Sequence, residues 1–187
     1  MFESSVEMYA RKINEALLKV SPVAIEDALA ALSIALNANK SIWIAGNGGS
    51  AATASHFATD LSRCTNKDSN PVRGISLCDN SSLITAIGND FGFEFIFSKQ
   101  LSNLATKGDL LVTLSASGNS QNLLSAMNWA KANGLSNLAL TGFDGGQAKL
   151  IADFSLHVPT AIGDYGVAED SHSILCHYLS TQFRTDR

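Results

Sequence analysis

The sequence predicts an α/β protein: a three-layer α/β/α sandwich with a five-stranded parallel sheet, preceded by an N-terminal helical hairpin. Three observations point to this fold. After Lys40, short apolar runs alternate with segments of helical spacing. The apolar runs do not alternate strictly with polar residues, which is typical of strands covered on both faces. Two glycine- or serine-rich segments each follow such a run and lead into a helical segment, as at the carboxyl edge of a doubly wound sheet.

The N-terminal 40 residues carry two helical stripes. Apolar residues recur at steps of three or four in both halves: Phe2, Val6, Tyr9, Ile13, Leu17 and Val20, then Ile25, Leu29, Leu32 and Leu36. Ser21-Pro22 separates them, because serine is a good N-cap and proline suits the first helical position. We expect the hairpin to bury its stripes on a partner subunit rather than on its own domain.

The remainder of the chain reads as alternating strands and helices. We expect strands near residues 41–45, 74–78, 109–114, 137–141 and 154–158, and helices near 49–63, 81–88 with 93–104, 120–133, 145–151 and 167–183. The polar stretch 65–71 reads as a loop. The 187 residues suffice for a single domain, in which 1–40 serve oligomerisation and 41–187 form the α/β core.

Composition limits the classes of function. Charged residues make up only 16% and apolar residues 45%, which favours a large core together with apolar surface buried between subunits. The net charge is −4, and the sequence has no cluster of basic residues like that of a nucleic-acid-binding protein. No apolar stretch approaches the roughly 18 residues of a membrane span. Three scattered cysteines argue for a reducing, cytoplasmic setting.

Two loops predict a phosphorylated ligand. Residues 46–50 read Gly-Asn-Gly-Gly-Ser and residues 115–120 read Ser-Ala-Ser-Gly-Asn-Ser. A strand that ends in small residues and feeds a helix presents free backbone N–H groups, and these together with the helix dipole favour an anion. The serine loop adds three hydroxyls, enough to meet the oxygens of one phosphate monoester.

Other interpretations of these loops fit less well. Residues 46–51 match the Gly-x-Gly-x-x-Ala dinucleotide fingerprint, and Asp79 follows the second strand where a ribose-binding carboxylate belongs. That interpretation leaves the serine loop unexplained. A P-loop is excluded, because no Gly-Lys-Ser/Thr follows either loop. Ordinary turn chemistry explains one such loop but poorly explains two.

Four ionisable residues accompany the loops. His56 and Asp60 are four apart on the first predicted helix of the core, and Glu169 and His177 are eight apart on the last. Each pair lies near one helix face. Two histidines with two carboxylates can act as acid and base, or can bind Zn²⁺ or a similar divalent ion.

At these residues the chain resembles the sugar isomerase (SIS) domain family and, within it, the phosphoheptose isomerases. The resemblance covers essentially the whole chain and rests on six segments: GNGGS at 46–50, SHFATDL at 55–61, AIGNDFGF at 86–93, SASGNS at 115–120, LTGFDGG at 140–146 and EDSHSILCH at 169–177. It implies a flavodoxin-like domain assembled as a homotetramer. It also implies isomerisation of sedoheptulose 7-phosphate to D-glycero-D-manno-heptose 7-phosphate through an enediol, the first step of bacterial ADP-heptose and surface-polysaccharide synthesis.

The resemblance also implies roles for particular residues. The catalytic positions are Asp60, Glu169 and His177. The metal positions, for one Zn²⁺ per subunit and no nucleotide cofactor, are His56, Asp60, Glu169 and His177. The positions that contact the phosphosugar are Asn47, Gly48, Gly49, Ser50, Asn89, Asp90, Ser115, Ala116, Ser117, Ser120 and Glu169.

Two departures from the family pattern concern carboxylates. The family carries glutamate at the position of Asp60 and glutamine at the position of Glu169. Aspartate is one methylene shorter, which matters where placement must be accurate. We therefore hypothesise that the catalytic carboxylate role has moved to Glu169 or is shared with it. Alternatives are a non-catalytic relative that binds a sugar phosphate or the replication initiator DnaA, and an isomerase of another sugar phosphate.

Overall fold

A computed structural model describes residues 5–64 and 72–183, so the expected loop at 65–71 lies outside the described residues. Within them, five parallel strands form one sheet in the order β2-β1-β3-β4-β5. The strands are β1 (Ser41–Gly46), β2 (Arg73–Ser76), β3 (Leu110–Ser115), β4 (Ser136–Thr141) and β5 (Phe154–His157). The predicted sheet is confirmed, with each strand end within about two residues of its expected place.

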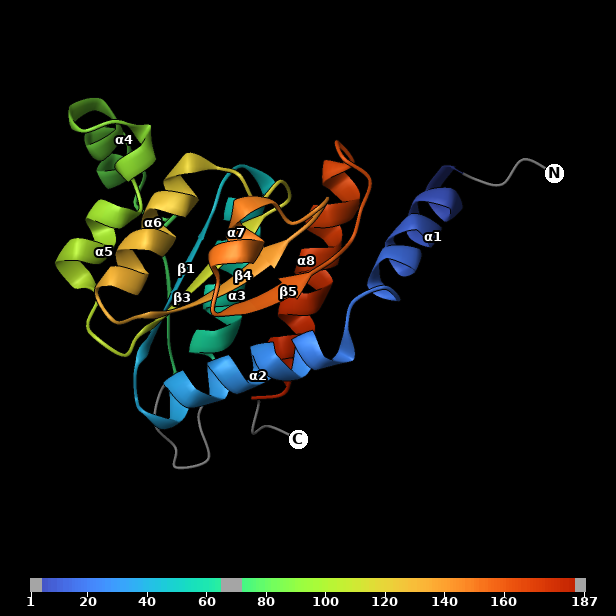
Figure 1. Ribbon diagram of the computed structural model, residues 1–187, viewed down its shortest axis with the longest axis horizontal. Helices are drawn as coiled ribbons and strands as arrows, with labels where there is room; N and C mark the ends of the chain where they lie inside the picture. Colours follow the sequence, from blue (N-terminus) through green and yellow to red (C-terminus); the bar gives the residue numbers. More distant parts are fainter. Residues whose placement is uncertain (1–4, 65–71, 184–187) are drawn as a thin grey trace.

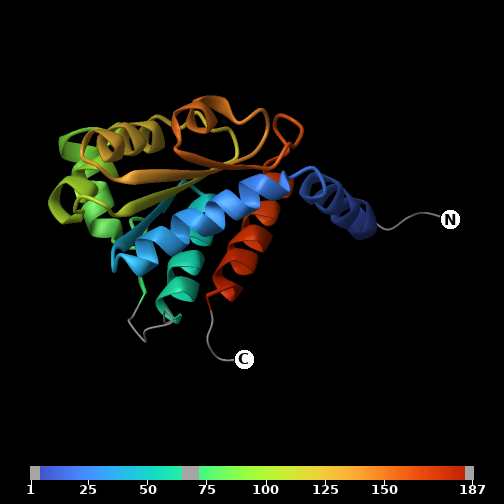
Figure 2. The same cartoon turned by 60° about the horizontal axis from the view of Figure 1, so that its bottom comes forward.

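Helices cover both faces of this sheet (Figures 1 and 2). One face carries α2 (Pro22–Asn37), α3 (Gly49–Ser62) and α8 (Tyr165–Thr181). The other face carries α4 (Ser81–Asp90), α5 (Ser98–Leu104), α6 (Gln121–Ala132) and α7 (Gly146–Ile151), with a 3₁₀ turn at Phe93–Phe95. Three layers result, as the sequence predicts.

Strand β1 shows why the apolar runs do not alternate with polar residues. Ile42 and Ile44 pack into the core under α2, α3 and α8, whereas Trp43 and Ala45 pack into the core under the other helices. Successive side chains of a strand point to opposite faces. Since both faces are covered, both sets of side chains must be apolar.

The N-terminal helices differ from the expected hairpin. Helix α2 lies across its own sheet, with Leu32 and Leu36 buried in the core, so the expectation that its stripe meets a partner is wrong. Helix α1 (Ser5–Leu17) projects from the domain (Figures 1 and 2) and contacts α8. The periodicity of a stripe shows that a face is buried, but it does not show what buries it.

The strand order creates a switch point between β1 and β3. The chain leaves β1 toward β2 on one side, and then crosses to β3 on the other side of β1. The loops that follow β1 and β3 therefore diverge and leave a crevice at the carboxyl edge, where ligands bind in such sheets. These are the two loops singled out from the sequence. In the described part of the chain, no helix combines the length and apolarity needed to cross a bilayer.

Candidate active site and metal centre

The glycine loop and the serine loop meet at one small cavity. The residues that line it come from both loops and from the start of α8: Asn47, Ser50, Leu114, Ser115, Ala116, Ser117, Ser120, Tyr165 and Glu169. Most of the expected ligand contacts are thus brought together. Four expected contacts are not among the lining residues: Gly48, Gly49, Asn89 and Asp90. Asn89 and Asp90 lie at the end of α4, where the Asn89 amide donates to Asp90 Oδ1 at 2.8 Å.

Close approaches explain the glycines of the first loop. Gly48 has φ +56° and ψ −124° at the N-cap of α3, a conformation that suits glycine. A Cβ at Gly49 would overlap the carboxylate of Glu169, and one at Gly46 would lie 2.5 Å from the Ser50 carbonyl oxygen. The bare backbone at Gly49 therefore allows the Glu169 carboxylate to lie against the first turn of α3.

Two hydroxyls of the serine loop act as hydrogen-bond acceptors within the loop, so they can still donate to a ligand. Ser115 Oγ accepts from the Gly118 N–H at 3.0 Å, and Ser117 Oγ accepts from the Asn119 N–H at 3.3 Å. Ser120 is the N-cap of α6 but makes no capping bond with its side chain. A hydroxyl that accepts one bond can still donate its hydrogen. The loop therefore offers hydroxyl donors and a helix N-terminus to an anion.

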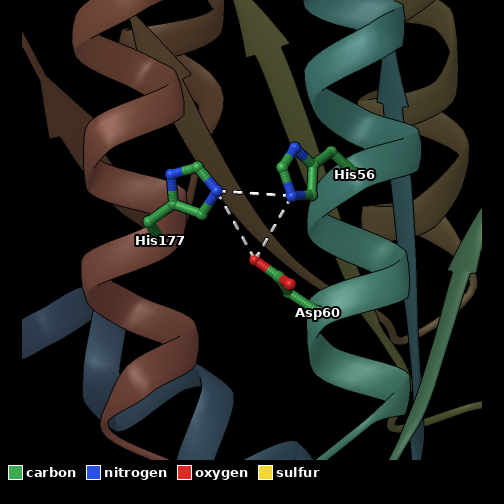
Figure 3. A group of neighbouring side chains, drawn as sticks. All are labelled: His56, Asp60 and His177. Atoms are coloured by element: carbon green, nitrogen blue, oxygen red, sulfur yellow. Dashed lines mark hydrogen bonds and ion pairs between the residues drawn. The ribbon is translucent and has the colours of Figure 1, made fainter.

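Three side chains converge in a possible metal centre (Figure 3). His56 and Asp60 lie on α3, and His177 lies on α8. The two histidine Nε2 atoms are 3.3 Å apart, and each lies 3.7 Å from Asp60 Oδ2. Asp60 is 5% exposed, whereas both imidazoles are about half exposed.

This triangle has the dimensions that a bound metal requires. The point equidistant from the three atoms lies about 2.1 Å from each of them, which is the length of a Zn–N or Zn–O bond. Two imidazoles and one carboxylate are also a ligand set that Zn²⁺ accepts while keeping a further position open. Cys176 is a poor competitor, because burial and then the Asp60 charge raise the pKa of its thiol.

Glu169 does not join this metal group, contrary to the expectation of four ligands. It precedes His177 by eight residues on α8, which is about 12 Å along the helix axis. Its carboxylate lies against Gly49 in the cavity instead. Spacing places both side chains near one helix face, but the rise of the helix separates them.

Two residues of the site escaped sequence reasoning. Tyr165 lines the cavity from the first turn of α8 and packs edge-on against Phe143, with ring centroids 5.0 Å apart. Asn122, buried in α6, hydrogen-bonds Asn47 of the glycine loop. A buried asparagine near a helix start gives only a weak sequence signal, because asparagine is also common there for capping.

The carboxylate required by the dinucleotide interpretation has another role. Ser55 donates a short hydrogen bond to Asp79 Oδ1 and lies 3.1 Å from Ser76 Oγ. Asp79 thus ties the end of β2 to α3.

Comparisons with known proteins agree with the resemblance. Residues 8–142 match the SIS domain family. The chain is 38% identical to a phosphoheptose isomerase of Campylobacter concisus, over 96% of this chain and 93% of that one. Its fold is similar to solved phosphoheptose isomerases of Neisseria gonorrhoeae (TM-score 0.84, 31% identity, covering 95% and 94% of the two chains) and Francisella tularensis (TM-score 0.84, 30% identity, covering 96% and 97%).

Proposed function

The chain belongs to the phosphoheptose isomerases of the SIS domain family, and from this premise we propose that it converts sedoheptulose 7-phosphate to D-glycero-D-manno-heptose 7-phosphate. The observation that carries the proposal is the cavity in which the serine loop and Glu169 face the same space. An anion site and a carboxylate base within one crevice are what an isomerase of a phosphosugar requires.

The serine loop holds the phosphate in this proposal. Ser115, Ser117 and Ser120 donate their hydroxyl hydrogens, and the N-terminus of α6 adds favourable backbone dipoles. The glycine loop then meets the sugar end, with Asn47, Gly48, Gly49 and Ser50 around the carbon that reacts. Asn89 and Asp90 remain proposed contacts, which the family motif supports.

Glu169 is the base in this proposal. Its carboxylate takes a proton from carbon 1 of the ketose, the electrons of that C–H bond form the enediol double bond, and the carbonyl oxygen on carbon 2 gains a proton. Proton return to carbon 2 with loss of the hydroxyl proton on carbon 1 gives the aldose. The family motif also supports an acid–base role for His177, which lies at the metal group about two helical turns further along α8.

Asp60 has the other carboxylate role, as a metal ligand. His56, Asp60 and His177 would hold the ion, which we propose to be Zn²⁺. Such an ion acts as a Lewis acid toward sugar oxygens. The buried position of Asp60, between the two imidazoles, suits a ligand that is held in place rather than a base that reaches the substrate.

We further propose that the enzyme works as a cytoplasmic homotetramer in which residues 1–40 contribute to assembly. Exposed apolar side chains on α1 support this, among them Val6, Met8 and Tyr9. The three cysteines, Cys64, Cys78 and Cys176, are scattered along the chain, which fits a reducing compartment.

Turnover of sedoheptulose 7-phosphate by the purified protein tests this function. The aldose should appear by NMR, and a chelator should slow its formation if the metal is catalytic. Binding of the sugar phosphate without turnover, in metal-loaded protein, would favour a non-catalytic SIS protein instead. Turnover of a different phosphosugar alone would favour the isomerase of another substrate.

A further inference from the structure

Asn122 joins the two ligand loops across the switch point. It is the second residue of α6 and is 2% exposed. Asn47 Nδ2 donates to Asn122 Oδ1 at 2.9 Å, and Asn122 Nδ2 donates to Asn47 Oδ1 at 2.8 Å. The two amides thus form a reciprocal pair between residues 75 apart in sequence, one from the glycine loop and one from the helix that follows the serine loop.

A backbone group fixes which way both amides point. The Leu123 N–H donates to Asn122 Oδ1 at 2.9 Å, and a backbone N–H can only donate, so the atom it meets must be an oxygen. The remaining Asn122 atom is then the amide nitrogen, which requires an oxygen on Asn47. The side-chain amide of Asn47 can still donate one hydrogen bond through Nδ2 and accept one through Oδ1, and Asn47 lines the cavity.

We propose that Asn122 is a positioning residue for the isomerisation. Through Asn47 it presents one oriented donor and one oriented acceptor to the sugar, and it sets the distance between the glycine loop and the phosphate-binding serines. The reacting carbon is then placed relative to the bound phosphate. This inference rests on the proposed function, because it assigns those two loops to the two ends of one substrate.

Hydrogen exchange tests the structural part of the inference without any ligand. In Asn122→Ala the backbone amides of Ala51 and Ala52 should exchange about 10-fold faster or more, because they donate to the carbonyls of Asn47 and Gly48, and this loop has lost its bond to α6. Asn137→Ala is the matched control, since Asn137 is also buried (1% exposed) and also hydrogen-bonds through its amide, but it lies in β4 near the opposite edge of the sheet. Unchanged exchange of the Ala51 and Ala52 amides in Asn122→Ala would overturn the inference.

A second variant keeps the test valid if alanine unfolds the protein. Asn122→Asp is nearly isosteric and still accepts from Leu123 and from Asn47 Nδ2, but it places an oxygen against Asn47 Oδ1. It should therefore also speed exchange of the Ala51 and Ala52 amides. Equal exchange in wild type and Asn122→Asp would count against the pair.

Kinetics test whether Asn122 acts through Asn47. Asn122→Ala should lower kcat by about 10- to 100-fold with a smaller change in KM, because the phosphate site remains while the reacting end is misplaced. The double variant with Asn47→Ala should be no slower than Asn47→Ala alone. Independent, multiplying losses would contradict the inference. An inactive wild type would refute the proposed function, and hydrogen exchange would still decide the role of the pair.

Discussion

Asp60 and Glu169 are both carboxylates of the candidate site, but they have different neighbours. Asp60 Oδ2 faces two imidazole nitrogens at 3.7 Å, whereas the Glu169 carboxylate lies against the backbone of Gly49 beside the serine loop. The first environment suits a metal ligand and the second suits a base. This difference supports the hypothesis that the base role lies with Glu169 and the ligand role with Asp60.

The two carboxylates should therefore fail in different ways when neutralised. Glu169→Gln should lower kcat by about 10²- to 10⁴-fold, the usual contribution of a general base, and should retain its metal. Asp60→Asn should lose metal affinity by about 10-fold or more. Kinetics and elemental analysis of both variants provide the check, with Glu26→Gln, at an exposed position of α2, as control. A fully active Glu169→Gln with an inactive Asp60→Asn would show that the base role has not moved.

His172 makes a separate prediction about pH. It is 1% exposed, so the protonated imidazole would be almost completely removed from water. Burial lowers the pKa of His172 to about 4, opposed in part by the Thr141 carbonyl and reinforced by His157. The unfolded chain therefore binds a proton near pH 6.5 that the folded chain does not accept until about pH 4.

The sign of this linkage fixes the direction of the effect. Protonation of His172 in the unfolded chain should leave the free energy of unfolding unchanged above about pH 6.5. As the pH falls toward 4, it should lower the free energy of unfolding by about 3 kcal/mol in total. Urea unfolding at pH 7.5, 6 and 5 measures it. His172→Gln should show a flatter dependence in this window, and an equally steep one would assign the effect to other groups.

At the scale of elements, Asp109 stabilises the sheet at the start of β3. This carboxylate is 2% exposed and accepts bonds from the Ser41 N–H at 3.0 Å, the Trp43 indole at 2.9 Å and the Thr106 N–H at 2.9 Å. It thereby joins the starts of β1 and β3. Since the ligand loops follow the other ends of these strands, Asp109 contributes to the fold without contacting the site.

Removing this carboxylate should destabilise the chain but leave its chemistry intact. Asp109→Ala leaves the buried Trp43 indole and two part-buried backbone N–H groups without their acceptor, which should cost about 3 kcal/mol of unfolding free energy. The urea midpoint should fall accordingly while kcat of the folded protein stays near wild type. A loss of kcat at unchanged stability would mean that this edge of the sheet couples to the site.

The strands and most helices could be predicted from the sequence because local patterns determine them. Apolar runs set β1 and β3, and Ser21-Pro22 sets the start of α2. The sequence also predicts that the helix ends between residues 88 and 93, and there Gly92, with φ +109°, separates α4 from the 3₁₀ turn. The packing partner of α2 could not be predicted, because an apolar stripe specifies burial and does not identify the surface that buries it.

Part of the candidate site could also be predicted, because local sequence patterns determine it. Both loops and the pair His56 and Asp60 follow from short spacings within one element. The separation of Glu169 from the metal group depends on the rise along α8, and the pair formed by Asn47 and Asn122 depends on the neighbouring placement of β1 and β3. Such contacts between distant segments require the folded structure.

At the level of the whole molecule, the exposed apolar side chains of α1 support the proposed assembly. Val6 is 74% exposed on it, and Tyr9 and Lys12 tie the helix to Asp170 and Asp164 near the start of α8. A projecting helix with exposed apolar side chains is typical of an assembly surface. The low charged fraction of the chain, 16%, agrees with this assignment.

Light scattering should therefore give a mass near four times the 19.8 kDa chain. Val6→Glu should shift the protein to smaller species, because it places a charge in an apolar interface. Leu150→Glu is the matched control, since Leu150 is equally exposed (74%) but lies on α7, across the sheet from α8. A monomeric wild type, or equal effects of the two variants, would contradict the role of α1.

The proposed isomerisation in the cavity between the two loops proceeds by proton transfer through an enediol. Incubation with sedoheptulose 7-phosphate in heavy water, followed by NMR, should give the aldose heptose 7-phosphate with deuterium on carbon 2. A Glu169→Gln variant should form this product about 10²-fold more slowly or worse. Absence of both the aldose and deuterium exchange in the metal-loaded wild type would refute proton transfer in this cavity.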